Sequence, residues 1–304
     1  MGDMSEIKHI SRFLILGHTG FIGQNLINYF RKKCPSLEII GLSSRDIDLT
    51  SHNDVRNLDD FFMPDTAVIV LSAIKRQCGD TLDNFKKNLK MTENICWLLS
   101  TRPVGKLIYF SSTAVYGEDI FNIKISEKTP VCPRSYYGMV KYISERLYWK
   151  ELQKIGKQSL LILRPSVIYG PGDKGDTYGP VKLANAAVKN EQIVLWGDGK
   201  ELRDFVFIDD LSKIVYRLIC RNSEGIVNIA SGVSYSFRNI VTILESIIEK
   251  KLNVKQKLRT KGKVDNKFIN LNLLKEIGGY SFVPLGEGMK TLYDYLQKNE
   301  KNND

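Results

Sequence analysis

Short apolar runs alternate with helical patterns along the first half of the chain. The runs are rich in β-branched residues and short enough to be strands that a sheet buries on both faces. They cover residues 12–17, 37–42, 67–73, 106–112 and 159–164. The clearest helical pattern between them places six residues on one stripe: Leu82, Phe85, Leu89, Thr92, Cys96 and Leu99. This alternation predicts an α/β fold with a doubly wound parallel sheet and right-handed crossovers.

The pattern changes beyond about residue 165. Loops rich in Gly and Pro are followed by two helical patterns and an isolated strand, at residues 209–221, 237–250 and 226–230. We expect residues 1–165 to form the first unit, together with a returning segment at about residues 200–232. Residues 166–199 and 233–304 are then expected to form a smaller, discontinuous C-terminal lobe.

The composition of 43% hydrophobic and 26% charged residues is that of a soluble globular protein. No apolar run approaches the roughly 20 residues that cross a bilayer. Residues 1–11 contain neither a hydrophobic signal core nor a myristoylation signal. We therefore expect a cytoplasmic protein without a membrane partner.

The cysteines and histidines argue against several kinds of site. Five cysteines are scattered without a Cys-x-x-Cys pattern, which indicates neither a disulfide framework nor a thiolate zinc site. The three histidines all lie in the first fifth of the chain, too few and too clustered for a multi-histidine metal centre or a Ser-His-Asp triad. We expect no metal, and acid-base chemistry by other side chains.

The net charge of +10 raises the question of nucleic-acid binding. The densest basic stretch, residues 249–263, lacks the interleaved aromatic residues of a stacking platform. A solvated surface is the preferred interpretation, and we expect no nucleic-acid partner. The charge also suits a small anionic ligand such as a nucleotide diphosphate.

Gly17, Gly20 and Gly23 recur at intervals of three where the first predicted strand meets a helix. Glycine allows a positive φ in the turn and lets backbone amides approach a pyrophosphate at the helix N-terminus. A plain tight turn is the alternative. The position after the first strand of a βαβ unit favours dinucleotide binding on a Rossmann fold.

The segment "GLSSRDIDL" at the end of the second strand bears on the choice of dinucleotide. An NAD site usually offers a carboxylate to the ribose diol here, whereas an NADP site offers a cation to the 2′-phosphate. Ser43 and Ser44 can hydrogen-bond a phosphate and Arg45 can neutralise it, so NADP is the preferred cofactor, with NAD as the alternative. Arg45 as an exposed loop residue and Asp46 as a ribose ligand stay open. Asp48 is expected either to contact adenine or to cap the next element.

The segment "SYYGMVKYISE" places Lys141 four residues after Tyr137. On a helix these two side chains are neighbours and can act on one ligand, while Tyr136 points elsewhere. By itself the pair is also compatible with ordinary packing and a solvated lysine.

Six segments in order carry a family resemblance: "GHTGFIG", "FSSTAVYG", "SYYGMVK", "RPSVIYGPG", "WGDGKELRDFVFIDDL" and "VNIASG". Together they resemble the extended short-chain dehydrogenase/reductases, in the epimerase/dehydratase family that acts on nucleotide sugars. The resemblance spans nearly the whole chain. It implies a Rossmann domain followed by a substrate-binding lobe, a nucleotide-sugar substrate and a homodimer.

The resemblance also implies roles for individual residues. Tyr137 would exchange a proton with the reacting sugar oxygen, and Lys141 would hold the nicotinamide ribose and lower the pKa of the tyrosine. A nearby cation is needed because a phenol with a pKa of about 10 is otherwise a poor acid-base group near neutrality. Ser112 takes the place of the catalytic Ser/Thr, with Ser111 and Thr113 as alternatives.

Binding residues follow from the same resemblance. Those expected at the cofactor are Gly17, Thr19, Gly20, Phe21, Ile22, Gly23, Ser43, Ser44, Arg45, Asp48, Leu49, Ser72, Ala73, Tyr137, Lys141 and Arg164. Those expected at the substrate are Ser112, Thr113 and Arg203, and the arginine would grip the diphosphate. The alternative for Arg203 is a surface pair with Asp204.

Departures from the family pattern narrow the reaction. The 4,6-dehydratases have an Asp-Glu pair after the catalytic Thr, where this chain has Thr113 and Ala114. GDP-fucose synthases have a cysteine at the position of Ala114 and a later histidine, whereas the last histidine here is His52. The 4-epimerases usually have Asn at the position of Val167.

The sequence therefore predicts an NADPH-dependent reductase of a 4-keto-6-deoxy nucleotide sugar. A 4-epimerase that retains NAD is the first alternative. A non-catalytic dinucleotide sensor is the second, and the intact set of Ser112, Tyr137 and Lys141 argues against it.

Overall fold

The computed structural model describes residues 10–117, 121–154, 159–174, 179–259 and 264–301. Its largest element is a six-stranded parallel sheet in the order β10-β6-β4-β3-β1-β2. The strands are β1 (Arg12–Leu16), β2 (Glu38–Leu42), β3 (Thr66–Val70), β4 (Lys106–Phe110), β6 (Leu160–Pro165) and β10 (Gly225–Ile229). The strand order reverses between β1 and β3, and in open α/β sheets ligands bind at the carboxyl ends of the strands beside such a point.

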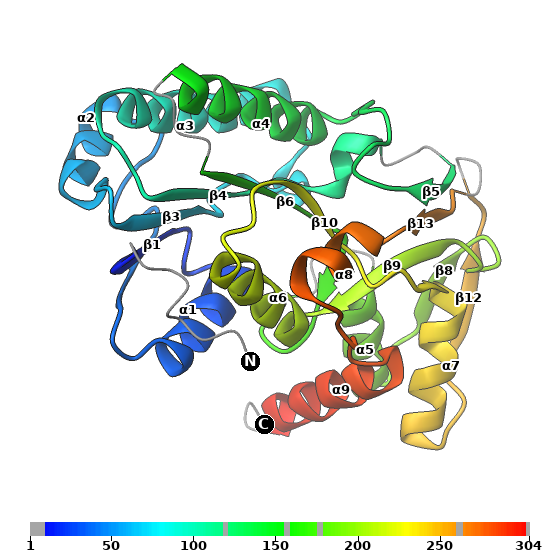
Figure 1. The fold of residues 1–304 in the computed structure, drawn as a ribbon. Coiled ribbons are helices and arrows are strands. Elements are labelled where there is room, and N and C mark those ends of the chain that lie inside the picture. Colours follow the sequence, from blue (N-terminus) through cyan, green and yellow to red (C-terminus); the bar gives the residue numbers. More distant parts are fainter. Residues whose placement is uncertain (1–9, 118–120, 155–158, 175–178, 260–263, 302–304) are drawn as a thin grey trace.

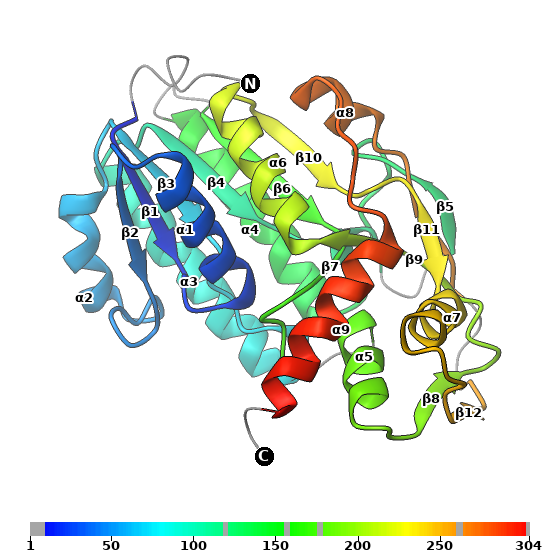
Figure 2. The same ribbon diagram turned by 90° about the horizontal axis from the view of Figure 1, so that it is seen from below.

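Helices cover both faces of this sheet (Figures 1 and 2). One face carries α1 (Phe21–Lys33) and α6 (Ile208–Cys220), with α8 (Leu271–Ile277) packed beside α6. The other carries α2 (His52–Val55), α3 (Leu82–Thr101) and α4 (Tyr136–Lys154), with a 3₁₀ helix at Arg56–Phe61. The expected α/β fold with a doubly wound parallel sheet is confirmed.

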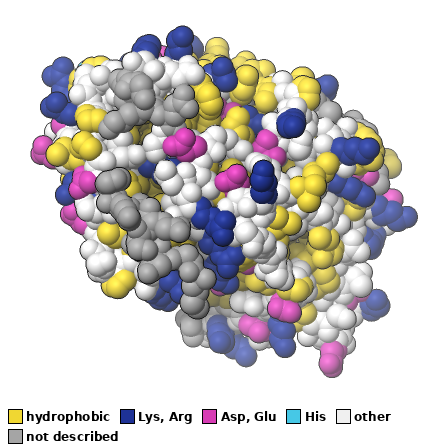
Figure 3. Space-filling view, in the orientation of Figure 1, with side chains coloured by type: hydrophobic (Ala, Val, Ile, Leu, Met, Phe, Trp, Pro, Cys, Tyr) yellow, Lys and Arg dark blue, Asp and Glu magenta, His cyan; other side chains and the backbone are white. Residues whose placement is uncertain are grey.

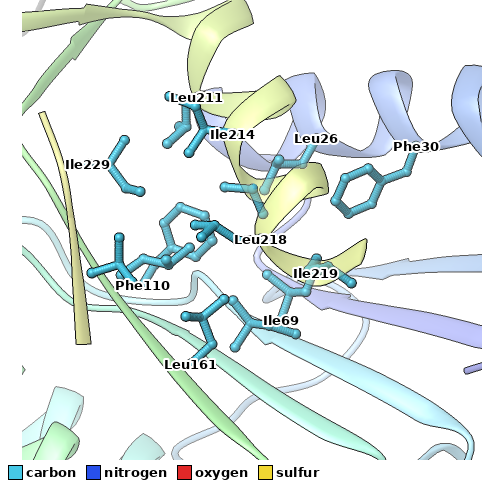
Figure 4. Close-up of a cluster of buried hydrophobic side chains, with 14 of the residues drawn as sticks. Leu26, Phe30, Ile69, Phe110, Leu161, Leu211, Ile214, Leu218, Ile219 and Ile229 are labelled. Atoms are coloured by element: carbon cyan, nitrogen blue, oxygen red, sulfur yellow. The ribbon is translucent and has the colours of Figure 1, made fainter. Parts of the chain in front are cut away.

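The continuous apolar runs of the strands follow from burial on both faces. In β1, Phe13 and Ile15 pack into the core beneath α1 and α6, whereas Leu14 and Leu16 pack into the core beneath α3 and α4. Successive side chains of a strand point to opposite faces, so a strand covered on both sides needs an apolar residue at every position. Figure 4 shows the first of these cores, in which Leu26 and Phe30 of α1 and four residues of α6 face the sheet: Leu211, Ile214, Leu218 and Ile219.

The smaller lobe has its own core. Its helices are α5 (Pro180–Val188), α7 (Phe237–Ile248) and α9 (Leu285–Lys301). Its strands form one three-stranded and one two-stranded sheet, from β7 (Val167–Tyr169), β9 (Leu202–Phe207) and β11 (Ser234–Ser236), and from β8 (Ile193–Trp196) and β12 (Val254–Lys257). A further pair, β5 (Asn122–Ile125) and β13 (Asn266–Phe268), joins segments that are far apart in sequence. Figure 2 shows α5, α7 and α9 gathered beside the main sheet.

The strand expected at residues 226–230, within the returning segment, is the edge strand of the main sheet, where β10 pairs in parallel with β6. The chain crosses into the lobe after β6 and returns with α6 and β10. In the returning segment, β9 pairs with β7 and β11 and not with the main sheet. The domain boundaries given above stay a prediction.

Lys and Arg side chains are scattered over the face seen in Figure 3, with acidic side chains between them. In the described part of the chain, every helix is too short or too polar to cross a membrane.

Candidate active site

The glycine-rich loop joins β1 to α1 at the point where the strand order reverses. Gly17 has φ +94°, and its amide donates to the Leu42 carbonyl at 2.7 Å. A Cβ on Gly17 would lie 2.9 Å from the Ser72 nitrogen, and a Cβ on Gly23 would lie 2.5 Å from the Gly17 carbonyl. The glycines therefore let three backbone segments approach one another closely.

Gly20 has a different place in this loop. It is exposed, its φ is negative, and a Cβ there would lie 3.4 Å from the Gly17 carbonyl. It caps α1 without a side-chain hydrogen bond, so the first amides of the helix, at Phe21 and Ile22, have no side-chain cap. Thr19 beside it is exposed as well. Such a helix N-terminus is suited to a pyrophosphate, and the residues present fit the phosphates of a dinucleotide.

A tight turn follows β2. The Asp46 carboxylate accepts hydrogen bonds from the Ser43 amide and the Ser43 hydroxyl, both at 2.7 Å. These bonds lower the pKa of Asp46, and the carboxylate is thereby bound within the turn. Ser44 and Arg45 are exposed at its tip, and the Arg45 amide donates to the Ser43 hydroxyl at 3.3 Å.

Asp48 and Leu49 lie just beyond this turn. The Asp48 carboxylate accepts from the amide and the hydroxyl of Thr50, at 2.9 and 2.7 Å, whereas the next helix, α2, has Ser51 as its N-cap. Leu49 is buried in the core on the α3 side, and its carbonyl accepts from Asn94 at 2.8 Å. Contact of either residue with adenine stays a prediction.

Ser72 and Ala73 follow β3 and line a small pocket that also includes Lys141. Asn88 of α3 holds the next residue, Ile74, through both its amide and its carbonyl, at 2.7 and 3.0 Å. Asn88 was missed from the sequence because an asparagine on an apolar helical stripe has no local signal for a contact 14 residues away.

Tyr137 lies in the first turn of α4, and Lys141 one turn later. Tyr137 is partly exposed, whereas Lys141 is 4% exposed and its Nζ donates to the Phe110 carbonyl at 2.7 Å. The same Nζ lies 5.7 Å from the centre of the Tyr137 ring. Burial lowers the pKa of Lys141 to about 7, and Glu145 opposes this shift.

Three hydroxyl residues follow β4, and the structure separates their roles. Ser111 is buried and donates to Glu145 at 2.5 Å. Ser112 is partly exposed, and its hydroxyl accepts from the Ala114 amide at 3.1 Å at the start of a 3₁₀ helix, Thr113–Tyr116. Thr113 donates to the Pro165 carbonyl at 3.1 Å. Of these three residues, Ser112 is thus the one that is partly exposed and whose hydroxyl acts as an acceptor in the hydrogen bond described.

Arg164 lies in the core, 2% exposed, and binds Glu145 through two nitrogens at 2.9 and 2.5 Å. It also donates to the Tyr116 hydroxyl at 2.8 Å. The hydrogen bonds and charge of Glu145 raise the pKa of Arg164 against the effect of burial, so the pair is ionic. The expected cofactor contact of Arg164 is untested, and this placement favours a structural role. Glu145, two turns after Tyr137, was missed from the sequence.

Arg203 lies at the start of β9 and forms an ion pair with Glu201. Asp204 is buried and accepts from Ser231 and Gly232, so the alternative of an Arg203–Asp204 surface pair is wrong. A second arginine, Arg259, reaches the same Glu201 carboxylate. Sequence alone did not indicate this contact, because the two residues are 58 positions apart.

The model of the NAD dependent epimerase/dehydratase family matches residues 13–230 of the chain. Among curated proteins, the chain is 28% identical over 249 residues to the GDP-6-deoxy-D-talose 4-dehydrogenase of Aggregatibacter actinomycetemcomitans, covering 81% of this chain and 83% of that protein. It is 22% identical over 311 residues to the GDP-L-colitose synthase of Yersinia pseudotuberculosis, covering 96% and 100%.

Among solved structures, the UDP-glucose 4-epimerase of Thermus thermophilus in complex with NAD superposes with a TM-score of 0.82. The two chains are 23% identical, and the superposition covers 94% of this chain and 99% of the other. At that identity the likeness concerns the fold.

Proposed function

Because the chain belongs to the NAD dependent epimerase/dehydratase family, we propose that it is an enzyme that reduces the 4-keto group of a 6-deoxy nucleotide sugar with NADPH. The observation that carries this proposal is that Tyr137 and Lys141, one turn apart in α4, lie beside the carboxyl end of β4, which Ser112 follows. Tyr137 and Ser112 are partly exposed, and Nζ of the buried Lys141 lies 5.7 Å from the centre of the Tyr137 ring.

A bound NADPH would supply the hydride that reduces the carbonyl carbon. Tyr137 donates its proton to the carbonyl oxygen as the carbon-oxygen double bond becomes a single bond, and the phenolate is then reprotonated from solvent. Lys141 stabilises that phenolate, and its bond to the Phe110 carbonyl fixes its position. Ser112 donates a hydrogen bond to the same carbonyl oxygen and orients it.

The turn after β2 supports NADP over NAD. The carboxylate best placed to accept from a ribose diol, Asp46, is already bound to Ser43. Ser44 and Arg45 are exposed at the tip of the same turn, where a cation can bind a 2′-phosphate.

The substrate class rests on the relative that acts at carbon 4 of a GDP-6-deoxy sugar by name. Reduction of a 4-keto sugar is that dehydrogenase reaction in reverse. A 4-epimerase is the competing function, because the chain shares its whole fold with an enzyme of that name. Val167, at the position where 4-epimerases usually have Asn, supports the reductase.

The test uses purified protein stripped of nucleotide, a 4-keto-6-deoxy nucleotide sugar and NADPH. We expect loss of reduced-nicotinamide absorbance in proportion to the sugar consumed, and one new 4-hydroxy sugar by NMR. Interconversion of two 4-hydroxy sugars without net oxidation of cofactor, together with no reduction of any keto sugar, would establish the epimerase instead.

We expect the active form to be a cytoplasmic homodimer, as the family resemblance implies. Sedimentation equilibrium of the purified chain measures the state directly, and a mass equal to one chain at assay concentration would contradict it.

A further inference from the structure

Glu201 lies between two arginines at the edge of the lobe. Its Oε1 accepts from Nη2 of Arg203 and its Oε2 accepts from Nη1 of Arg259, so each carboxylate oxygen binds one guanidinium. Arg203 is two positions further along an extended segment and therefore lies on the same side of it. The side chains are 14%, 20% and 18% exposed, in the order Glu201, Arg203, Arg259. The cluster is partly shielded from water but open on one side.

Backbone groups also fix the positions of both arginines. Arg203 Nη1 donates to two backbone carbonyls, Leu202 at 2.8 Å and Val264 at 2.5 Å. Arg259 packs against Gly197, which has φ +60° and where a Cβ would lie 2.9 Å from the Arg259 Nε. A larger residue at position 197 would displace this guanidinium. The positions of the two cations are therefore set by the backbone as well as by Glu201.

Hydrogen bonds connect the strand that carries Arg203 to the segments around Ser112. Asp204, next to Arg203, accepts from the Ser166 hydroxyl at 3.1 Å. Ser166 follows Pro165, whose carbonyl accepts from Thr113 at 3.1 Å. These bonds link β9 to the segment that follows Ser112, and the Asp204 side chain that makes the first of them points to the opposite face of the strand from Arg203.

The charges do not balance within the cluster, because two guanidinium groups face one carboxylate. A diphosphate carries at least two negative charges and binds guanidinium groups through paired hydrogen bonds. A diphosphate would bind the same guanidinium N–H groups that Glu201 binds. The carboxylate and a diphosphate therefore compete for Arg203 and Arg259.

We propose that Glu201 is an internal competitor for the nucleotide diphosphate: it binds the two arginines in the free protein and must leave them when the substrate binds. This inference rests on the proposed function, since it concerns the affinity of the same substrate. Because of this competition, the protein binds the diphosphate with lower affinity than two arginines without Glu201 would give. The product is therefore released faster.

The test measures binding of UDP and of GDP by calorimetry to the parent, Glu201→Gln and Glu201→Asp. Glu201→Gln removes the negative charge and should increase the affinity for whichever of UDP and GDP the parent binds by about 5- to 20-fold. This range is the effect of one charge-assisted hydrogen bond, reduced because the site is partly exposed. Glu201→Asp keeps the charge but shortens the side chain, and should give a smaller gain. Glu191→Gln, an exposed position of the same lobe, should leave affinity unchanged.

Uridine and guanosine, which lack phosphates, are the ligand controls and should show no gain in any variant. Equal or weaker diphosphate binding by the folded variants would overturn the proposal and give Glu201 a role in orienting the arginines. A gain shared by the nucleosides would also overturn it. If neither the parent nor any variant binds either diphosphate, the proposed function fails together with this inference.

Discussion

Substitutions at two glycines in the loop between β1 and α1 should affect different properties. Gly23→Ala should lower the stability of the fold, and Gly20→Ala should lower the affinity for the cofactor. A Cβ at position 23 would lie 2.5 Å from the Gly17 carbonyl and 2.6 Å from the His18 Cα. Both are backbone atoms, so the overlap cannot be relieved by a change of rotamer. A Cβ at position 20 would lie 3.4 Å from its nearest neighbour, and Gly20 has a negative φ.

The expected magnitudes follow from these distances. Gly23→Ala overpacks a buried site, which costs about 1–3 kcal/mol of unfolding free energy. At about 2–4 °C per kcal/mol this lowers the melting temperature by roughly 2–12 °C. Gly20→Ala loses a favourable helix N-cap and should cost at most about 1 kcal/mol. Its methyl group, however, would stand where a pyrophosphate approaches the amides of Phe21 and Ile22, so cofactor affinity should fall at least about tenfold, or 1.4 kcal/mol.

Differential scanning fluorimetry gives the melting temperatures, and quenching of reduced-nicotinamide fluorescence gives the affinities. Gly286→Ala in α9 is a control outside the loop that shares the change of residue, because Gly286 is exposed and a Cβ there would have no neighbour within 4 Å. Binding of NADPH and NADH by Gly20→Ala with the affinity of the parent would refute the placement of the pyrophosphate. A melting temperature of Gly23→Ala equal to that of the parent would refute the packing argument.

Three further predictions test the site. Tyr137→Phe should abolish turnover with little change in cofactor affinity or melting temperature, and Tyr136→Phe should be milder; equal turnover by Tyr137→Phe and the parent would exclude the acid-base role. Arg45→Ala should remove most of a roughly 10- to 150-fold preference for NADPH over NADH, worth about 1.5–3 kcal/mol, and a parent that prefers NADH would exclude the NADP assignment. Burial lowers the pKa of Lys141 to about 7 from an ordinary 10.5, so between these pH values the unfolded chain binds more protons than the folded chain. The free energy of unfolding of the parent should therefore rise, relative to that of Lys141→Met, as the pH rises from about 7 to 10. Denaturant titrations at pH 7 and 10 that show the same difference between the two proteins would contradict that shift.

The sequence predicts the fold well where local pattern decides it. Strands buried on both faces leave continuous apolar runs, and the glycine spacing marks the loop after β1. The pairing of β10 with β6 is different, because about 60 residues, which include strands of the lobe and α6, separate the two strands and no local pattern records which strands become neighbours.

The residues of the candidate site also differ in how far the sequence predicts their contacts. Tyr137 and Lys141 are visible as a helical pair, since one turn of helix fixes their relation. Glu145 binds Ser111 and Arg164 from other elements, and Glu201 binds Arg259 from a distant segment. Each of these contacts depends on tertiary packing, so the residue type suggests a charge but not its partner. The role of Asp46 was likewise ambiguous until its bonds to Ser43 were seen.

The central claim is that hydride passes from an exchangeable NADPH to carbon 4 of the sugar. The most direct test supplies NADPH deuterated at the transferable position of the nicotinamide, with a 4-keto-6-deoxy nucleotide sugar, and locates the deuterium by NMR and mass spectrometry. We predict one deuterium at carbon 4 of each product molecule and none elsewhere, with one NADP formed per sugar. A product without deuterium at carbon 4, or turnover that continues without consumption of NADPH, would contradict the claim.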